Sequence, residues 1–255
     1  MIIAVAFAII ATPCFLFVRE RENRNVRPIF GLTMLKESTA QTLHALRSGH
    51  EYPGLLRFLL GRVFYMDAIN TVIAYMFLYT QNVAEASGLT PAQGEQQAKW
   101  VMMAAITCAV AGGYVCGRAV DAKGPRRILN SVLWLWIGTF ALAAAVGAFR
   151  LPIVALFVVA GLAGIGLGGI QAADRPYLLR LAPPNRIGEF YGLYGMVGRF
   201  SYITGPLIWG AIMYWTVERG HLAPLTGQAF AIVSLLVMVV IGYGVLQGIG
   251  ESRNR

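Results

Sequence analysis

Long apolar runs separated by short charged segments dominate this chain. The uncharged runs cover residues 1–18, 68–84, 100–117, 128–149, 151–173, 200–217 and 222–250. A helix needs about 20 apolar residues to cross the hydrocarbon core of a bilayer, with roughly 17 as the lower limit. Each run therefore predicts one transmembrane helix, seven in all. The second and sixth helices are expected to extend over the residues around Arg57, Arg62 and Arg199.

The composition agrees with an all-α membrane protein. Of the 255 residues, 57% are hydrophobic and 13% charged, whereas soluble domains carry about 25% charged residues. The pattern predicts four parts: a lone helix at 1–18, a cytoplasmic linker at 19–53, a six-helix domain at 54–250 and a tail at 251–255. Leucines at helical spacing in the linker favour either an amphipathic helix on the membrane surface or a partly ordered polar segment.

Basic residues are divided unequally between the two sets of loops. Of the 21 Lys and Arg, 15 fall in 19–53, 118–127, 174–189 and the tail, whereas the opposite loops hold three. The positive-inside rule places the first set in the cytoplasm, with the amino terminus outside and the carboxy terminus cytoplasmic. The net charge of +9 follows from this orientation. A nucleic-acid partner is not expected, because it would need a basic face on a soluble domain.

Residue types that carry catalysis or bind metals lack the necessary spacing. The three cysteines lie inside predicted spans and the three histidines are scattered, which excludes a recognisable metal-binding pattern. No span contains a catalytic motif or a close pair of carboxylates. We therefore expect neither an enzyme activity nor a cofactor nor a metal.

A charged turn between the third and fourth predicted helices stands out. It reads Gly117-Arg-Ala-Val-Asp-Ala-Lys-Gly-Pro-Arg-Arg127. Gly117 and Gly124 permit a sharp turn and close helix approach, and Asp121 with Arg126 and Arg127 can form charge-assisted hydrogen bonds at helix ends. An ordinary positive-inside turn would explain the basic residues but neither the acid nor the glycine spacing.

This turn resembles the signature G-x-x-x-D-x-x-G-[RK]-[RK] of the major facilitator superfamily of transporters. The matching residues are Gly117, Asp121, Gly124 and Arg126. Pro125 stands where the first basic residue usually lies, and Arg127 compensates for it. In the family this turn latches the inward face closed, since its acid caps a helix of the opposite half. The resemblance assigns this gating role to Asp121 and Arg126, together with Arg127 and Arg175.

The resemblance extends over essentially the whole chain. A lone helix, a long linker and six further helices correspond to the sixth through twelfth helices of a twelve-helix carrier built from two halves. Two segments, Arg62–Thr71 and Arg180–Tyr194, resemble the vacuolar amino-acid effluxer-like branch. The expected fold is thus a major-facilitator six-helix half-bundle preceded by one helix.

The resemblance also implies a function. It implies a secondary transporter in a bacterial inner membrane that moves a small polar solute, such as an amino acid, by alternating access. The expected partners are the lipid bilayer, the solute, a proton, and either a missing amino-terminal half or a second subunit of a split carrier. The alternative is a membrane-embedded interaction protein or scaffold that does not transport.

Polar residues inside the predicted helices are candidates for the solute or proton site, because they are costly in lipid. Asp67 lies in the second span, and residues on the same helix face extend from it: Asn70, Thr71 and Tyr75. One interpretation is that Asp67 binds a substrate amine or carries a coupled proton. The other is that Asp67 pairs with Arg62 or Arg199 and only holds helices together.

Two later spans hold further candidates. Gln171 ends a glycine-rich run whose Gly164–Gly169 segment predicts close helix packing, since a nucleotide loop would need a preceding strand. Arg199, about one third into the sixth span, either pairs with a solute carboxylate or with the acid of the second span, or extends toward the inner surface. Gly205 and Pro206 predict a bend in the same span.

Overall fold

The computed structural model describes residue 12 and residues 53–248, and each of their secondary-structure elements is helical. The long helices are α3 (Pro53–Ala86), α4 (Pro91–Lys123), α5 (Pro125–Phe149), α6 (Val154–Leu181) and α9 (Pro224–Gln247). Between α6 and α9 lie the 3-10 turn η2 (Pro184–Arg186), α7 (Ile187–Phe200), α8 (Thr204–Met213) and the π-helical turn η3 (Tyr214–Arg219). The predicted all-α class is confirmed. Apart from Thr12, the lone helix at 1–18, the linker up to residue 52 and the tail at 251–255 lie outside the described residues.

Five of these helices, α3, α4, α5, α6 and α9, are long and apolar enough to cross a membrane. They correspond to the second, third, fourth, fifth and seventh predicted spans. Helix α3 begins at Pro53 and includes Arg57 and Arg62, which agrees with the predicted extension of the second span. The protein is therefore a multi-pass α-helical membrane protein.

The sixth predicted span is discontinuous. Helix α7 ends at Phe200 and α8 begins at Thr204, with turns at residues 201–203. The sequence predicted a bend at Gly205 and Pro206, and the break lies directly before this pair. A proline inside a helix lacks an N–H group, and its ring clashes with the carbonyl four residues earlier, here that of Tyr202. The continuous helix expected over 200–217 is therefore interrupted at this point.

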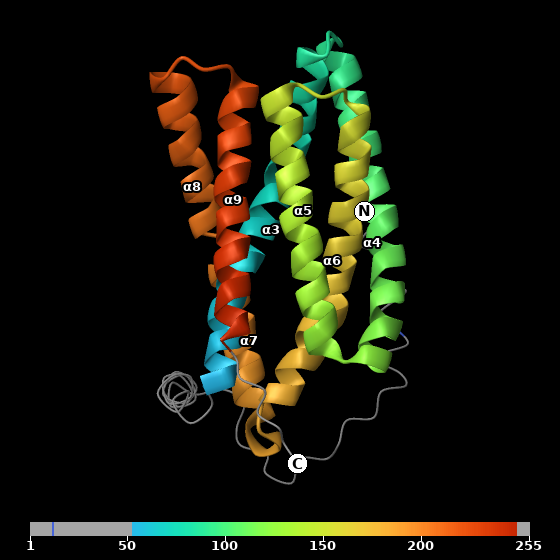
Figure 1. Ribbon diagram of the computed structural model, residues 1–255, viewed down its shortest axis with the longest axis vertical. Helices are drawn as coiled ribbons and strands as arrows, with labels where there is room; N and C mark the ends of the chain where they lie inside the picture. Colours follow the sequence, from blue (N-terminus) through green and yellow to red (C-terminus); the bar gives the residue numbers. More distant parts are fainter. Residues whose placement is uncertain (1–11, 13–52, 249–255) are drawn as a thin grey trace. The chain divides into compact units, whose positions relative to one another are not determined.

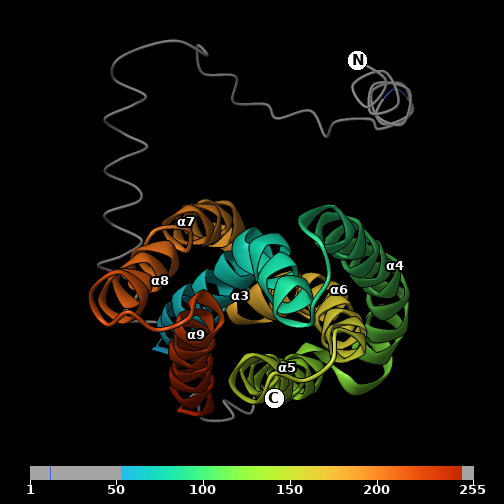
Figure 2. The same cartoon turned by 90° about the horizontal axis from the view of Figure 1, so that it is seen from above.

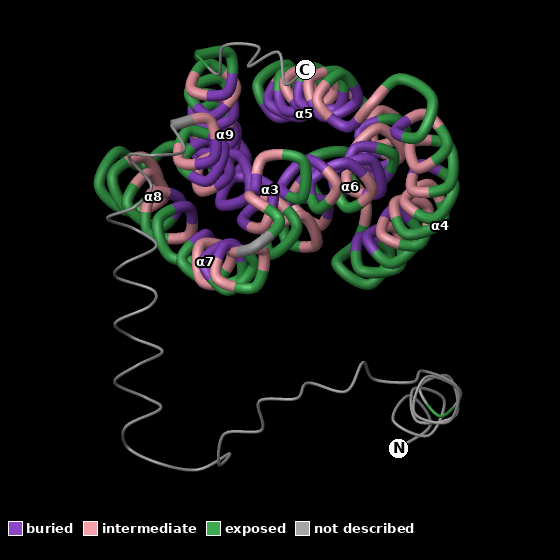
Figure 3. Tube along the Cα trace, turned by 90° about the horizontal axis from the view of Figure 1, so that it is seen from below, coloured by how far each residue is buried: buried purple, intermediate pink, exposed green. Residues whose placement is uncertain are grey.

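Helix α3 lies in the middle of this part of the chain. Seen from above, α7, α8 and α9 lie on one side of α3, and α4, α5 and α6 lie on the other (Figure 2). Helix α3 contacts helices on both sides. Buried positions concentrate where α3, α5, α6 and α9 face one another, whereas α4 and α8 carry exposed residues on their outer sides (Figure 3). Both groups of helices therefore pack against one central element.

Helices α4 and α6 approach each other through glycines. A methyl group on Gly164 would lie 2.2 Å from the carbonyl oxygen of Ala105. One on Gly168 would lie 2.2 Å from the carbonyl oxygen of Ala109 and 2.4 Å from the amide nitrogen of Gly113. Such contacts with main-chain atoms leave no room for a side chain. The predicted role of Gly164–Gly169 in close helix packing is confirmed.

The turns between helices lie at two ends of the bundle. The α4–α5 and α6–α7 connections lie at the same end as the start of α3, and the α3–α4, α5–α6 and α8–α9 connections lie at the other (Figure 1). The α4–α5 turn depends on Gly124, whose φ of 85° is accessible mainly to glycine. The basic segments 118–127 and 174–189 thus share one end of the bundle, as their charge predicted.

Replacing Gly168 with alanine tests the α4–α6 contact. We expect a loss of at least about 3 kcal/mol, the upper range for overpacking, because the new methyl group meets main-chain atoms that cannot move aside. Thermal unfolding in detergent, followed by tryptophan fluorescence, measures the effect. Gly138→Ala is the matched control, since a methyl group there meets nothing within 4 Å. Equal melting temperatures of the two variants would contradict the packing argument.

Candidate functional site

Asp67 closes the amino-terminal end of α8 from the neighbouring helix α3. Its side chain is fully buried, and its Oδ2 accepts a hydrogen bond of 2.8 Å from the amide N–H of Gly205. Thr204 also interacts with this carboxylate through its main chain and its side chain, but Oδ1 receives no well-aligned hydrogen bond. The first N–H groups of a helix lack partners within the helix and carry partial positive charge. Asp67 therefore acts as a helix cap that comes from another helix.

The close approach of α3 and α8 depends on Gly205. A methyl group at this position would lie 2.0 Å from Oγ1 of Thr71 and 2.9 Å from Oδ1 of Asp67. The Thr71 hydroxyl donates to the carbonyl oxygen of Asp67 at 2.7 Å, which turns it back onto its own helix. Any residue larger than glycine would separate Asp67 from the helix end that it caps.

The other residues of the predicted stripe face the same break. The Asn70 side-chain amide donates to the carbonyl oxygen of Ser201 at 3.3 Å, a main-chain group that the break leaves outside regular helix. Further along, Tyr75 stacks on Trp209 of α8 with ring centroids 4.7 Å apart and nearly parallel planes. The stripe predicted from helical spacing therefore lies against the α7–α8 break and the first part of α8.

Neither arginine suggested as a partner of Asp67 binds it. Arg62 forms its ion pair with Asp174, at 2.7 Å between Nε and Oδ2. Arg199 is exposed near the end of α7 and makes no ion pair with any residue between 53 and 248. The structural role suggested for Asp67 is thus met by main-chain N–H groups, which carry no formal charge.

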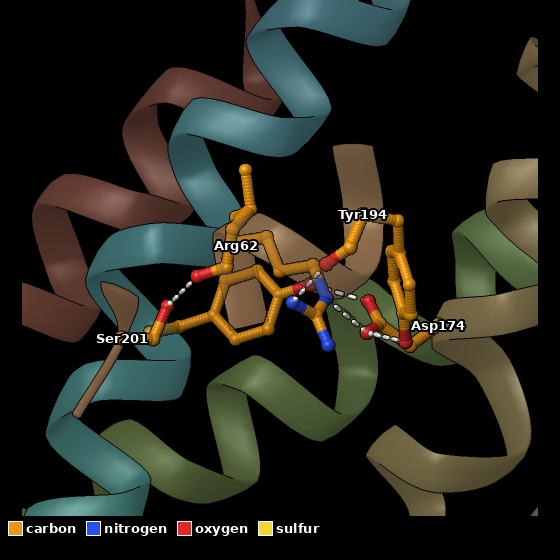
Figure 4. A network of polar contacts seen from close by, with 6 residues as sticks. Arg62, Asp174, Tyr194 and Ser201 are labelled. Carbon is orange, nitrogen blue, oxygen red and sulfur yellow. Dashed lines mark hydrogen bonds and ion pairs between the residues drawn. The ribbon is translucent and has the colours of Figure 1, made fainter. Parts of the chain in front are cut away.

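A second buried network joins α3, α6 and α7. Asp174 accepts hydrogen bonds from the hydroxyl groups of Tyr65, at 2.5 Å, and Tyr194, at 2.7 Å, in addition to its ion pair with Arg62. The Arg62 guanidinium lies 3.7 Å from the centroid of the Tyr194 ring and also donates to the carbonyl oxygen of Tyr194. Figure 4 shows the Arg62, Asp174 and Tyr194 side chains pointing toward one another. Each charge in this network is paired and hydrogen-bonded, which a buried ion pair requires.

This network was missed by the sequence analysis, which placed Asp174 at the start of a cytoplasmic loop at 174–189. That placement is wrong, because α6 continues through Pro176 to Leu181 and Asp174 is 2% exposed. Two signals could have indicated it. The apolar run resumes directly after Pro176, and Tyr65 follows Arg62 by three residues, which places both on one face of α3.

The residues of the predicted gating turn lie together at one end of the bundle. Asp121, Arg127 and Arg175 are exposed, and a methyl group on Gly117 would meet open space. Arg126 lies close enough to Tyr177 of α6 for an electrostatic interaction. A terminal nitrogen of Arg180, also on α6, lies 3.1 Å from the position of a methyl group on Gly124. The turn therefore lies near the carboxy-terminal end of α6.

A cavity of about 620 Å³ lies on another side of α3, between α3, α4, α5 and α6. Helix α3 contributes Val72, Ile73 and Met76 to a lining that is mostly apolar. The predicted candidate Gln171 is exposed and lies among the lining residues, whereas Asp67 does not. Helix α3 thus separates an apolar cavity from the polar α7–α8 break.

The fold and this site define a multi-pass α-helical membrane protein with a helix that is broken beside a buried acid. The whole chain, residues 1–255, matches the family described as "Vacuole effluxer Atg22 like", and the chain belongs to this family.

Three curated relatives support this assignment. The uncharacterized MFS-type transporter YxiO of Bacillus subtilis is 25% identical over 254 residues, which are 98% of this chain and 53% of that protein. Autophagy-related protein 22 of Coccidioides immitis is 32% identical over 84 residues, 33% of this chain and 13% of the relative. Its counterpart in Vanderwaltozyma polyspora is 20% identical over 224 residues, 83% of this chain and 40% of the relative. The chain therefore spans about half the length of the relatives it matches, or less. No solved structure matches it significantly.

Variants of Arg62 and Asp174 test the buried network. We expect Arg62→Met or Asp174→Asn alone to cost about 3–5 kcal/mol of stability, because each leaves a buried charge without its partner. The double variant should be more stable than either single one, since no charge remains, the asparagine oxygen still accepts from one tyrosine hydroxyl, and its amide N–H can donate to the oxygen of the other. Thermal unfolding in detergent measures all three. The exposed Arg199→Met serves as control, with an expected change within about 0.5 kcal/mol. Additive losses in the double variant would rule out a paired network.

Proposed function

We propose that this chain forms a six-helix domain of a secondary transporter that moves small polar solutes, with amino acids as the substrate class, by alternating access. The discontinuous α7–α8 helix with the buried Asp67 at its break carries this proposal. Broken membrane helices are found where transporters bind substrates and ions near the bilayer midplane. Ionisable residues inside the membrane mark such pathways because their burial is costly.

The contacts on the two sides of α3 support movement by alternating access. Helices α4 and α6 meet through glycines with main-chain contacts, which favours a rigid pair. On the other side, α7 is attached to α3 through Arg62 and Tyr194, and α8 through Asp67 and Gly205. Between the two attachments lie the turns at residues 201–203. In this proposal α7 and α8 tilt separately about these turns, while α4 and α6 move as one body.

The proposed orientation places the basic end of the bundle in the cytoplasm of a bacterium, with the amino terminus outside. At that end Gly117, Asp121 and Gly124 form the gating turn, together with Arg126, Arg127 and Arg175. A second six-helix unit, on the same polypeptide or on a partner subunit, completes the solute path. One observation supports this part: the Bacillus subtilis relative is about twice as long.

Counterflow in proteoliposomes tests the transport proposal. Vesicles loaded with a mixture of unlabelled amino acids are diluted into single labelled ones, with the chain alone and with the chain expressed together with the amino-terminal half of the Bacillus subtilis relative. We expect transient accumulation of at least one amino acid above protein-free vesicles in the form that contains both halves. Folded protein that accumulates none of them in either form would overturn the proposal and favour a membrane-embedded scaffold.

Asp67→Asn tests proton coupling. An amide cannot carry a proton, so we expect counterflow to persist while uptake driven by a pH gradient falls at least about tenfold, toward the level without a gradient. Uptake rates measured at equal and at unequal pH across the vesicle membrane distinguish counterflow from uptake driven by the pH gradient. Glu95→Gln is the matched control, because this exposed acid pairs with Lys99 near the start of α4. Unchanged gradient dependence in Asp67→Asn would exclude Asp67 as the proton carrier.

A further inference from the structure

We propose that the amino-terminal end of α8 is a binding site for the carboxylate group of the transported solute, and that Asp67 occupies this site in the state observed here. The inference rests on the proposed transport function and specifies which part of the solute is recognised. It also assigns Asp67 a role that differs from binding an amine, because here the acid takes the place of the solute anion.

The end of α8 offers a small set of hydrogen-bond donors. Helix α8 has 10 residues and begins Thr204-Gly205-Pro206. Proline has no N–H group, so the first turn presents the amides of Thr204 and Gly205 and the Thr204 hydroxyl. These donors converge at the positive end of a helix, an arrangement that suits a carboxylate. Helix ends of this kind hold the carboxylates of substrates in other transporters with broken helices.

These donors satisfy only one of the two Asp67 oxygens well. Its Oδ2 accepts the Gly205 N–H, whereas Oδ1 is buried without a well-aligned partner. A buried carboxylate oxygen without a donor is unfavourable, because it has lost its hydration without a replacement. The side chain also enters from α3, so its geometry is limited by the position of that helix. A free carboxylate has no such restriction and can orient both oxygens toward the donors.

Thr204, which supplies two of these donors, lies on a side that Asp67 does not occupy. Tyr202 and Ile203, directly before α8, have exposed fractions of 62% and 52%, and Thr204 is exposed as well. Asp67 and Gly205 are buried behind them. Thr204 interacts with Asp67 and also lies at this surface, so it links the buried acid to the open side. An approaching carboxylate can therefore reach Thr204 without displacement of α3.

Exchange of the two carboxylates follows from electrostatics. Two negative groups at one helix end repel each other, so the solute anion and the ionised Asp67 exclude one another. When the solute binds, Asp67 must withdraw from the end of α8, and the contact between α3 and α8 that Gly205 permits is released. Solute binding is thereby coupled to movement of α8 relative to α3.

Chemical rescue tests the site without a transport assay. Asp67→Ala removes the side-chain carboxylate and leaves a space that formate can fill. We expect this variant to unfold at a lower temperature than the wild type, and millimolar formate to recover at least half of the shift. Formamide, which has the same shape and no charge, should recover much less. The wild type and Asp67→Asn, whose amide oxygen still accepts from Gly205, should not respond. If Asp67→Ala yields folded protein only with formate present, that recovery is itself the expected result.

The proposal would be overturned if formate had no specific effect on Asp67→Ala and none on Asp67→Ser, since a free carboxylate would then have no site at α8. A general salt effect, seen equally with chloride and in the wild type, would overturn it as well.

Competition in the counterflow assay separates this inference from the transport function. For an amino acid that accumulates, its N-acetyl derivative keeps the carboxylate, and its amide keeps the amine. We expect the N-acetyl derivative to inhibit counterflow at least tenfold more strongly than the amide. Stronger inhibition by the amide would retain transport and overturn the carboxylate site, whereas the absence of counterflow for every amino acid would overturn the transport proposal itself.

Discussion

A break in a membrane helix leaves main-chain N–H and C=O groups without partners, and the hydrocarbon core offers no water to satisfy them. In this protein the break at residues 201–203 is stabilised mainly by α3. Asp67 accepts from the Gly205 N–H, and Asn70 donates to the Ser201 carbonyl oxygen. One polar helix face thus satisfies a donor on one side of the break and an acceptor on the other. The discontinuous helix, the position of α8 and the proposed site all depend on these contacts.

Helix α3 therefore has a larger role than its share of the bundle suggests. Toward its amino-terminal end, Arg62 and Tyr65 join Asp174 of α6 and Tyr194 of α7 in a fully paired network. Five residues after Arg62, Asp67 contacts α8 through an uncharged partner. These two contacts of α3 differ in chemistry. The ion pair of Arg62 and Asp174, with its two tyrosine hydroxyls, is costly to break. The carboxylate of Asp67 at the end of α8 can be replaced by another carboxylate. This difference makes the contact of α3 with α7 the more costly of the two to break.

The relatives and the geometry complement each other. The family assignment covers the whole chain, but the relatives are about twice its length or more, so features that need a second six-helix unit remain proposals. The α7–α8 break does not depend on that unit, because its contacts lie between described helices. The apolar cavity on the other side of α3 is distinct from this polar site. Helix α3 borders both the apolar cavity and the polar α7–α8 break, so a solute path through either one runs along α3.

The sequence by itself determined the membrane class, the positions of the five long described spans, the location of the basic segments 118–127 and 174–189 at one end of the bundle, and the close glycine packing of α6. These features follow from local properties: the length of the apolar runs, the distribution of basic residues between alternate loops, and the size of residues at helical spacing. It also indicated the stripe that contains Asp67. The sequence could not identify the partner of Asp67. The rotation of α3 about its own axis is not encoded locally, so Arg62, Arg199 and the end of α8 were all possible partners. Asp174 lies 112 residues from Arg62 in the chain, and only the packing of α3 against α6 and α7 selects that pairing. Tertiary structure decided which charges are paired and which main-chain ends are capped, because both depend on how helices rotate and approach one another, which local sequence does not encode.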